Sequence, residues 1–285
     1  MPELYVVGTP LGNLGDMSAR ALDTLRMVDF IAAEDTRVTM KLLQVFDIHT
    51  PLVSLHMHNE ADKGRSLAER LIQRQEKAAL VTDAGMPCIS DPGYLFVRYC
   101  TEMGIPVLTV PGPSAGTAAV SVSGVDAREW LFCGFLPREK KSLEAKLREL
   151  PGRCRVAVVH ESPYRILDLM ETVVRTLPGC RVSLSCDLTK LHELTLRGRA
   201  EDVLETMRQN PKVEKGEYCL VMDFHEVDIP GEKTEENPEV EEELLLVRLM
   251  LQGMTLREAQ ENRIAAGGRK NAVKAAGIRV KELFS

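Results

Sequence analysis

The chain has 285 residues, of which 44% are hydrophobic and 27% are charged, and its net charge is -6. This length allows two domains or one large domain, and the composition is ordinary for a soluble globular enzyme. The acidic balance excludes a protein coated in basic surface, although a local basic patch could still bind nucleic acid.

The first part of the chain alternates strand and helix patterns. Strands are expected at Leu4–Val7, Phe30–Ala33, Leu52–Leu55, Ala79–Thr82 and Val107–Val110. Helices are expected between them at Ser18–Met27, Thr36–Phe46, Asn59–Arg74 and Tyr94–Met103, with Ser18 as an N-cap. The alternation predicts a five-stranded parallel sheet with helices on both faces.

The stretch Gly104–Val125 carries no charge and is long enough to span a bilayer, but it contains three prolines and several glycines. Because a membrane helix tolerates such residues poorly, we expect a strand, a loop and a helix of small residues instead. The N-terminus shows no secretion signal, and the seven scattered cysteines contain no CxxC pair. These features predict reduced thiols and a cytoplasmic location.

A second α/β unit begins near Trp130. Its strands are expected at Leu131–Phe135, Arg155–Val159, Val182–Ser185 and Tyr218–Met222, and its helices at Pro163–Thr176 and Glu201–Gln209. We therefore expect an α/β fold of two domains, the first at residues 1–118 with the parallel sheet and the second at residues 119–226.

The segment Glu226–Glu243 has nine acidic residues against one lysine, which predicts a solvated linker at residues 227–243. Short helices are expected beyond it at Leu244–Gln252, Leu256–Ala265 and Lys270–Leu283. From Leu256 onward, seven basic and three acidic residues give a net charge of +4. Residues 244–285 are therefore expected to form a small basic helical domain.

Three of the predicted strands end in loops of Gly, Pro and small polar residues, which read GTPLGNLG, DAGMPCISDPG and PGPSAG. The carboxyl ends of parallel strands share the sheet edge at which open α/β sheets bind ligands. Glycine lets the backbone approach a ligand closely, and proline holds a loop in shape. The first loop has neither the GxGxxG spacing nor the Lys-Ser/Thr of a P-loop. The loops together predict a pocket for a sizeable cofactor that is read largely by main chain.

Polar clusters follow other strands. AEDTR ends the second strand, and HMHNE ends the third. The two histidines of HMHNE could ligate a metal, but no further ligands occur at matching spacing, so we expect no metal site. In the second unit, the clusters HESPYR, SCDLTK and KGE lie at strand ends and could face the first domain.

Nine motifs occur in order between Leu4 and about Met222: GTPLGNLGD, AEDTR, HxHNE, DAGMPxISDPG, PGPSA, GFLPR, HESPYR, LTKLHE and KGE. In this set the chain resembles the ribosomal small-subunit RNA cytidine 2′-O-methyltransferases of the tetrapyrrole methylase superfamily. The resemblance implies S-adenosyl-L-methionine as cofactor in a cleft between two α/β domains, 16S rRNA or the 30S subunit as substrate, and a homodimer. A porphyrinoid C-methyltransferase of the same fold and a non-catalytic RNA-binding protein are the alternatives.

Carried over by position, the resemblance implies ten cofactor-binding residues: Pro10, Asp83, Ala84, Gly85, Met86, Ile89, Ser114, Ala115, Glu161 and Ser162. AEDTR and HxHNE distinguish the RNA enzymes from the porphyrinoid enzymes and are assigned to the substrate side. The chain departs from the family at His160, where an aromatic residue is usual, and at Cys186-Asp187, where Arg-Glu is usual.

A ribose hydroxyl is a weak acid, so a base or a cation that stabilises the alkoxide would assist its methylation. We expect Asp35 or His58 to accept the proton, and Arg37 and Lys190 to hold phosphate or the developing oxyanion. The alternative is that the segment Glu34–Arg37 holds only a structural ion pair and that the proton passes to water.

Overall fold

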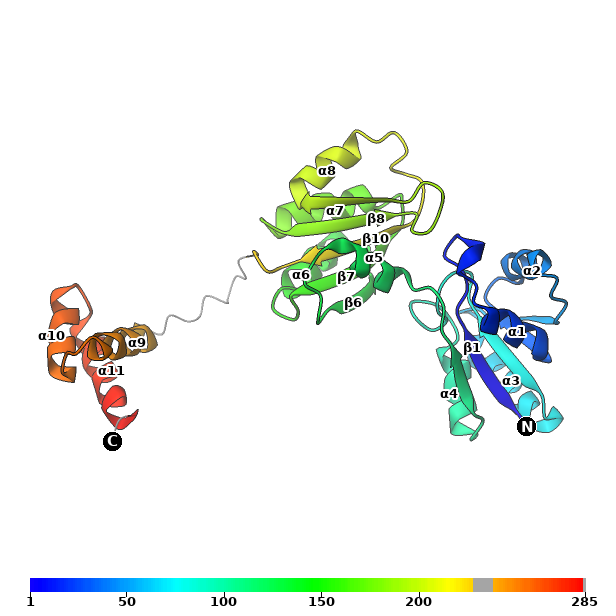
Figure 1. Ribbon diagram of the computed structural model, residues 1–285, viewed down its shortest axis with the longest axis horizontal. Coiled ribbons are helices and arrows are strands. Elements are labelled where there is room, and N and C mark those ends of the chain that lie inside the picture. Colours follow the sequence, from blue (N-terminus) through cyan, green and yellow to red (C-terminus); the bar gives the residue numbers. More distant parts are fainter. Residues whose placement is uncertain (228–237, 284–285) are drawn as a thin grey trace. The chain divides into compact units, whose positions relative to one another are not determined.

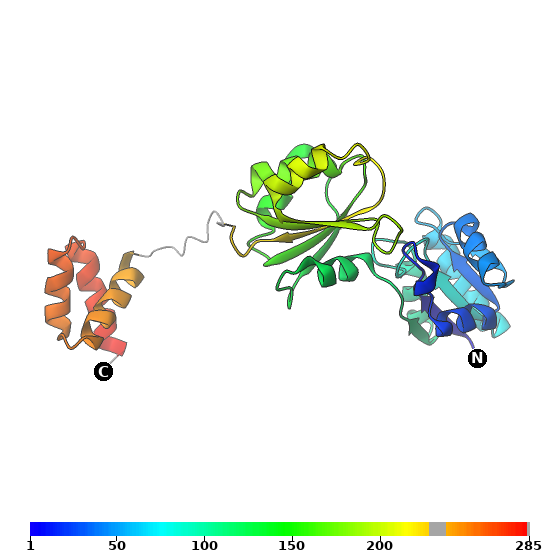
Figure 2. The same ribbon diagram turned by 45° about the horizontal axis from the view of Figure 1, so that its top comes forward.

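The computed structural model describes residues 1–227 and 238–283. The chain divides into two compact units, Met1–Val227 and Asp228–Ser285. The first unit contains two five-stranded sheets, and the described part of the second contains helices (Figures 1 and 2). Among the described residues, no helix is both long and apolar enough to cross a membrane.

The first sheet contains β1 (Glu3–Val7), β2 (Phe30–Ala33), β3 (Leu52–Ser54), β4 (Lys77–Val81) and β5 (Val107–Val110). Its order is β3-β2-β4-β1-β5, and every pair is parallel, as predicted. The helices are α1 (Ala19–Met27), α2 (Thr36–Val45), α3 (Glu60–Arg74) and α4 (Tyr94–Glu102). The Ser18 hydroxyl accepts a hydrogen bond from the Ala21 N–H at 3.1 Å, which confirms the predicted N-cap.

Both faces of this sheet are buried, which explains why its strands read as apolar runs rather than as an alternation. In β4, Ala78 and Leu80 pack against α3 and α4, while Ala79 and Val81 pack against α1 and α2. The loops at the carboxyl ends of the five strands therefore lie at one edge, which stays open for a ligand.

The second sheet contains β6 (Leu131–Phe135), β7 (Val156–Glu161), β8 (Arg181–Cys186), β9 (Leu194–Arg199) and β10 (Tyr218–Asp223). Its order is β6-β7-β10-β8-β9, and only β6 and β7 are parallel. The helices α6 (Lys140–Glu149), α7 (Ile166–Thr176) and α8 (Ala200–Arg208) pack on one face, and α5 (Ala115–Ser123) packs on the other. The predicted domain boundary after residue 118 falls inside α5.

The sequence patterns did not predict β9 or α6. β9 is an edge strand whose residues are all exposed or half-buried, so it lacks the apolar run of a buried strand. α6 buries only Leu143 and Leu147 beneath a charged surface. The uncharged stretch Gly104–Val125 forms β5, a loop and α5, as predicted.

The second unit contains α9 (Pro238–Leu251), α10 (Leu256–Ala265) and α11 (Lys270–Leu283) around a small core that includes Leu246, Ala259 and Val273. The bounds of α10 and α11 are those predicted. The expected linker is corrected at residues 238–243, which belong to α9, because proline suits a first helical position and glutamates suit a first turn. The rest of the expected linker, residues 228–237, lies outside the described residues.

Candidate cofactor and substrate site

Three loops at the edge of the first sheet are fastened together by their backbones. Thr9 and Gly85 exchange backbone hydrogen bonds of 2.9 and 3.0 Å, and the Thr9 hydroxyl donates to the Thr82 carbonyl at 3.0 Å. Gly8 touches Gly112 so closely that a Cβ on Gly8 would lie 2.6 Å from the Gly112 Cα. Glycine is therefore required where the loop after β1 meets the loop after β5.

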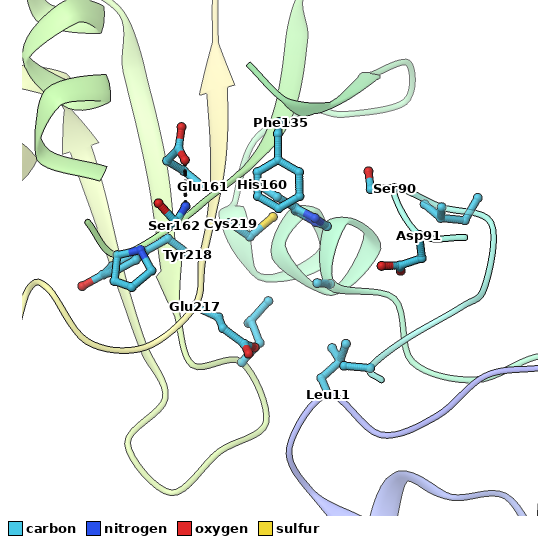
Figure 3. A pocket seen from close by; sticks show the side chains of 15 residues that line it. Leu11, Ser90, Asp91, Phe135, His160, Glu161, Ser162, Glu217, Tyr218 and Cys219 are labelled. Atoms are coloured by element: carbon cyan, nitrogen blue, oxygen red, sulfur yellow. Dashed lines mark hydrogen bonds between the residues drawn. The ribbon is translucent and has the colours of Figure 1, made fainter. Parts of the chain in front are cut away.

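A groove lies in front of these loops and consists of two adjoining cavities of about 390 and 290 Å³. Both cavities are lined by Leu11, Ala84, Ile89, Asp91, Ala115 and His160. Figure 3 shows Leu11 and Asp91 across the groove from His160 and Glu217. The groove is thus formed by the edge of the first sheet, the start of α5 and the edge of the second sheet.

Eight of the ten expected cofactor residues line this groove: Ala84, Gly85, Met86, Ile89, Ser114, Ala115, Glu161 and Ser162. The other two, Pro10 and Asp83, line a third cavity of about 430 Å³. The third cavity shares Leu11, Ala84 and Glu217 with the groove, so it is a neighbour of the groove. The structure brings the ten residues together, while their binding role stays a prediction.

The second sheet contributes side chains to the groove. The His160 ring packs edge to face against Phe132 and Phe135, with ring centroids 5.0 and 5.9 Å apart. Burial lowers the pKa of His160, so its imidazole is neutral, and its Nε2 is buried without a hydrogen-bond partner. His160 therefore occupies an aromatic setting at the wall of the groove.

Glu161 is a buried carboxylate whose two oxygens have different contacts. It is 4% exposed, and its Oε1 accepts a hydrogen bond from the Ser162 N–H at 2.8 Å (Figure 3). Its Oε2 lies 3.5 Å from the Arg165 guanidinium and has no hydrogen-bond partner. Both oxygens of Glu161 therefore have partners in the protein, one through a hydrogen bond and one through an ion pair, whereas the buried Nε2 of His160 has none, and such an atom beside a groove fits a bound polar ligand.

Asp91 is a groove residue that the sequence patterns missed. Burial, followed by the charges of Glu34 and Asp83, raises the pKa of Asp91 to about 7. Burial also raises the pKa of Asp83. Asp91 belongs to the SDPG segment after β4, and only the fold brings it beside a cavity. Carboxylates crowded at one edge would favour a cationic ligand.

Asp35 and Arg37 form an ion pair at the start of α2. The Asp35 carboxylate accepts hydrogen bonds from the Arg37 backbone at 2.8 Å and from its guanidinium at 2.6 Å. The hydrogen bonds from Arg37 lower the pKa of Asp35 to about 2. The expected ion pair within Glu34–Arg37 is therefore present, and Glu34 instead accepts a hydrogen bond from the Thr82 hydroxyl at 2.6 Å. An aspartate held in this way is a weak base.

His58 is exposed and does not line any of the three cavities. The neighbouring Glu60 is buried, and its Oε1 accepts hydrogen bonds from the backbones of Gly93 and Leu95 at 2.8 and 2.7 Å. Glu60 thus fixes the loop before α4, which holds Ile89 and Asp91. Within the described residues, no group of three or more His, Cys, Asp and Glu side chains could hold a metal ion.

Lys190 reaches the first loop from the second sheet. Its ammonium lies 2.9 Å from Asp187 and 3.2 Å from Glu217, and a Cβ on Gly12 would lie 2.4 Å from its Cγ. Burial lowers the pKa of Lys190, but the hydrogen bond to Asp187 and the charge of Glu217 outweigh it, so its pKa is raised. A charged ammonium therefore lies beside Glu217, which lines both the groove and the third cavity.

The antiparallel direction of β10 explains why polar residues of three strands lie together beside the groove. Tyr218, at the start of β10, pairs with Glu161 at the end of β7 and with Cys186 at the end of β8. The clusters HESPYR, SCDLTK and KGE therefore lie at one edge, although KGE precedes its strand and the other two follow theirs.

Comparisons with known proteins agree with this architecture. A family profile described as Tetrapyrrole (Corrin/Porphyrin) Methylases matches residues 3–204. The chain is 43% identical over 232 residues to "Ribosomal RNA small subunit methyltransferase I" of Halalkalibacterium halodurans, covering 81% of this chain and 78% of that protein. It is 37% identical over 276 residues to the protein of the same name from Bacillus subtilis, covering 96% of this chain and 89% of that protein.

Solved structures share the fold at low identity. Uroporphyrin-III-C-methyltransferase from Thermus thermophilus matches with a TM-score of 0.52 and 19% identity, over 78% of this chain and 94% of that chain. Diphthine synthase matches with a TM-score of 0.57 and 13% identity, over 77% of this chain and 88% of that chain.

Proposed function

The chain belongs to the tetrapyrrole methylase family and, within it, to the small-subunit ribosomal RNA methyltransferases I, and from this premise we propose its reaction. It transfers a methyl group from S-adenosyl-L-methionine to the 2′-hydroxyl of a cytidine in 16S rRNA. The observation that carries the proposal is identity of 43% and 37% to such enzymes over 81% and 96% of the chain. The porphyrinoid alternative has 19% identity in its support, which indicates a common fold alone.

The residues of the groove suit this cofactor. Main chain of the three loops and small side chains such as Ala84 and Ala115 would admit the adenosyl and methionyl parts. The carboxylates of Asp91 and Glu161 would favour the cationic sulfonium. S-adenosyl-L-methionine supplies a methyl group on an excellent leaving group, so the protein's task is chiefly to align the acceptor hydroxyl.

The cations beside the groove have the roles proposed for an RNA substrate. We assign Arg37, whose side chain is 86% exposed, to a phosphate of the substrate, and Lys190 to the developing oxyanion. Because the pKa of Asp35 is about 2, we assign Asp35 to fixing Arg37 rather than to accepting the proton. His58 or water accepts the proton in this scheme, and His58 would approach the acceptor only with RNA bound.

The decisive experiment is methyl transfer from labelled cofactor to 30S subunits, naked 16S rRNA and uroporphyrinogen, followed by identification of the product. We expect 2′-O-methylcytidine from an RNA substrate and no labelled tetrapyrrole. A labelled tetrapyrrole would support the porphyrinoid alternative. RNA binding without cofactor binding would support a non-catalytic protein.

Single alanine replacements test the substrate side. Asp35→Ala, Arg37→Ala, His58→Ala and Lys190→Ala should lower the single-turnover rate with saturating subunits and leave cofactor affinity intact. Arg98→Ala removes another exposed ion pair, with Glu102 on α4, and serves as the control. Wild-type rates in all four variants would show that the substrate edge is assigned wrongly.

The second unit is proposed to add RNA affinity without selecting the nucleotide. Two of its basic residues, Arg263 and Arg279, form ion pairs with Glu242 and Glu243. The phosphate contacts are assigned to other basic residues of this unit, Arg269, Lys270, Lys274 and Lys281, together with Arg138, Lys140 and Lys141 in the first unit.

Because α9 begins at Pro238, truncation after Val227 tests this proposal better than truncation at residue 240. We expect weaker 30S binding and a shallower dependence of affinity on salt. Unchanged affinity at low salt would exclude the second unit from RNA binding.

We also propose a cytoplasmic location, for which the sequence features are the support, and a homodimer, for which the family alone is the support. Light scattering at micromolar concentration should give a particle of about twice the 31.7 kDa chain mass. A particle of the chain mass would contradict the dimer.

A further inference from the structure

The third cavity has the size and lining of a binding site. Its volume of about 430 Å³ falls within the roughly 300–1,000 Å³ that is usual for small-molecule sites. Its apolar lining comes from the first loop and α2: Leu11, Leu14, Val38, Leu42 and Val45. Leu14, Val38 and Val45 are 44%, 42% and 61% exposed, so this apolar surface is incompletely covered by the protein. Asp83 and Lys41 add charged groups to the same wall.

Thr39, which also lines this cavity, has a hydroxyl with no partner. The residue is 3% exposed, and its Oγ1 is buried without a hydrogen bond. A helical threonine can donate this hydroxyl to the carbonyl four residues earlier. Thr24, Thr172 and Thr206 do so in this protein, at 2.7, 2.7 and 2.9 Å. Thr39 thus has a hydroxyl that forms no hydrogen bond within the protein and that belongs to a residue lining the cavity.

The position of the cavity connects it with the transferred methyl group. It shares Leu11, Ala84 and Glu217 with the groove. Arg37 precedes Val38 on α2, and the Lys190 ammonium lies 3.2 Å from Glu217. A nucleotide whose ribose is at the groove could therefore have its base in the cavity and its phosphate near a cation.

Given the proposed function, we propose that this cavity takes the target nucleobase of the RNA, unstacked from its neighbours. A nucleobase has two apolar faces and a polar edge, and proteins that read single-stranded RNA bind bases by both features. The apolar side chains of α2 and the first loop cover the faces. In this proposal Asp83, which the sequence assigned to the cofactor, instead reads the base, because it lines the third cavity and not the groove. Its carboxylate accepts a hydrogen bond from the exocyclic amino group of cytosine, and the Thr39 hydroxyl bonds to the same edge after rotating about χ1.

Filling the cavity tests its role. Val38→Trp places a bulky ring at the cavity, whereas Met40→Trp places one on α2 at a residue that does not line it. Val38→Trp should lower the single-turnover rate on 30S subunits by about a hundredfold, with cofactor affinity unchanged. Met40→Trp should retain both. Equal rates in Val38→Trp and wild type would overturn the proposal.

The Thr39 hydroxyl has its own matched pair of variants. Thr39→Val should lower the rate by roughly twofold to tenfold, as expected for one neutral hydrogen bond, and Thr39→Ser should retain most of it. Thr39→Val should not lower the melting temperature, because no hydrogen bond is lost in the free protein. A rate unchanged in Thr39→Val would exclude the hydroxyl from recognition. Absence of methyl transfer by the wild type would instead refute the proposed function itself.

Discussion

The two sheets of the first unit form the groove by different means. The first sheet lines the groove with the backbone of its loops, which we call the backbone wall. Hydrogen bonds between Thr9 and Gly85 and the contact of Gly8 with Gly112 hold these loops together. The second sheet lines the groove with side chains, namely the neutral His160 and the buried Glu161, which we call the side-chain wall. A backbone wall depends on the sequence only where glycine is required, whereas a side-chain wall changes its chemistry with each substitution. Substitutions should therefore disturb the first wall through its backbone geometry and the second wall through its charge and hydrogen bonding.

The largest effect is expected where the backbone wall is closed by glycine. Gly8→Ala puts a Cβ 2.6 Å from the Gly112 Cα, so the loops after β1 and β5 must separate. Because close-packed backbone cannot absorb such a contact, cofactor affinity should fall by more than about a hundredfold. Gly85→Val should also abolish binding, since Gly85 has a φ of 85° that a β-branched residue rarely adopts.

Isothermal calorimetry measures both losses. Gly104→Ala is the control, because Gly104 has a φ of 71° but nothing lies within 4 Å of its added Cβ. This control should lose some stability and keep cofactor affinity. Undiminished affinity in Gly8→Ala and Gly85→Val would show that the groove is not read by its backbone wall.

A smaller effect is expected at the side-chain wall. Glu161→Gln keeps an oxygen for the Ser162 N–H but removes the buried charge. We expect cofactor affinity to fall by about tenfold, because a cationic ligand loses a charged partner. The control is Glu171→Gln, which alters a surface ion pair with Arg208. Equal affinities in the two variants would leave Glu161 as a structural partner of Arg165 alone.

The same contrast explains what the sequence could predict. In the first sheet, β2 and β4 are buried apolar runs and every loop follows its strand, so the edge could be located without knowing the strand order. In the second sheet, Glu217 precedes β10, and it joins Glu161 only because β10 runs antiparallel to β7. An ion pair within Glu34–Arg37 was one of two alternatives that the sequence left open. The place of Asp91 beside the groove and the unpaired Thr39 hydroxyl depend on side-chain geometry, which spacing along the chain does not determine.

A further test concerns the contact between the two walls, where Lys190 of the second sheet lies against Gly12 of the loop after β1. Lys190→Met keeps the aliphatic stem beside Gly12 and removes the ammonium, while Gly12→Ala displaces the stem. Both should lower the single-turnover rate by roughly tenfold, with cofactor affinity within about twofold. If either variant lost cofactor affinity as strongly as Gly8→Ala, the contact between the walls would belong to the cofactor site.

The smallest effect is expected in the pH dependence of stability at Asp91. Burial and the charges of Glu34 and Asp83 raise its pKa to about 7 in the folded protein, whereas an unfolded aspartate has a pKa near 3.9. Between these values the unfolded chain releases a proton that the folded chain keeps. The contribution of Asp91 to stability is therefore fully present below about pH 4 and is lost as pH rises to about 7.

Asp91→Asn removes this titration. Urea unfolding should give the variant and the wild type similar relative stability at about pH 4. At about pH 8 the variant should be more stable by about 1–2 kcal/mol, a figure discounted for solvent screening of a half-buried group. Asp23→Asn changes an aspartate that is 78% exposed in its side chain and should show no such difference. If Asp91→Asn kept the pH dependence of the wild type, another group would be its source, and the pKa of Asp91 would not be raised by folding.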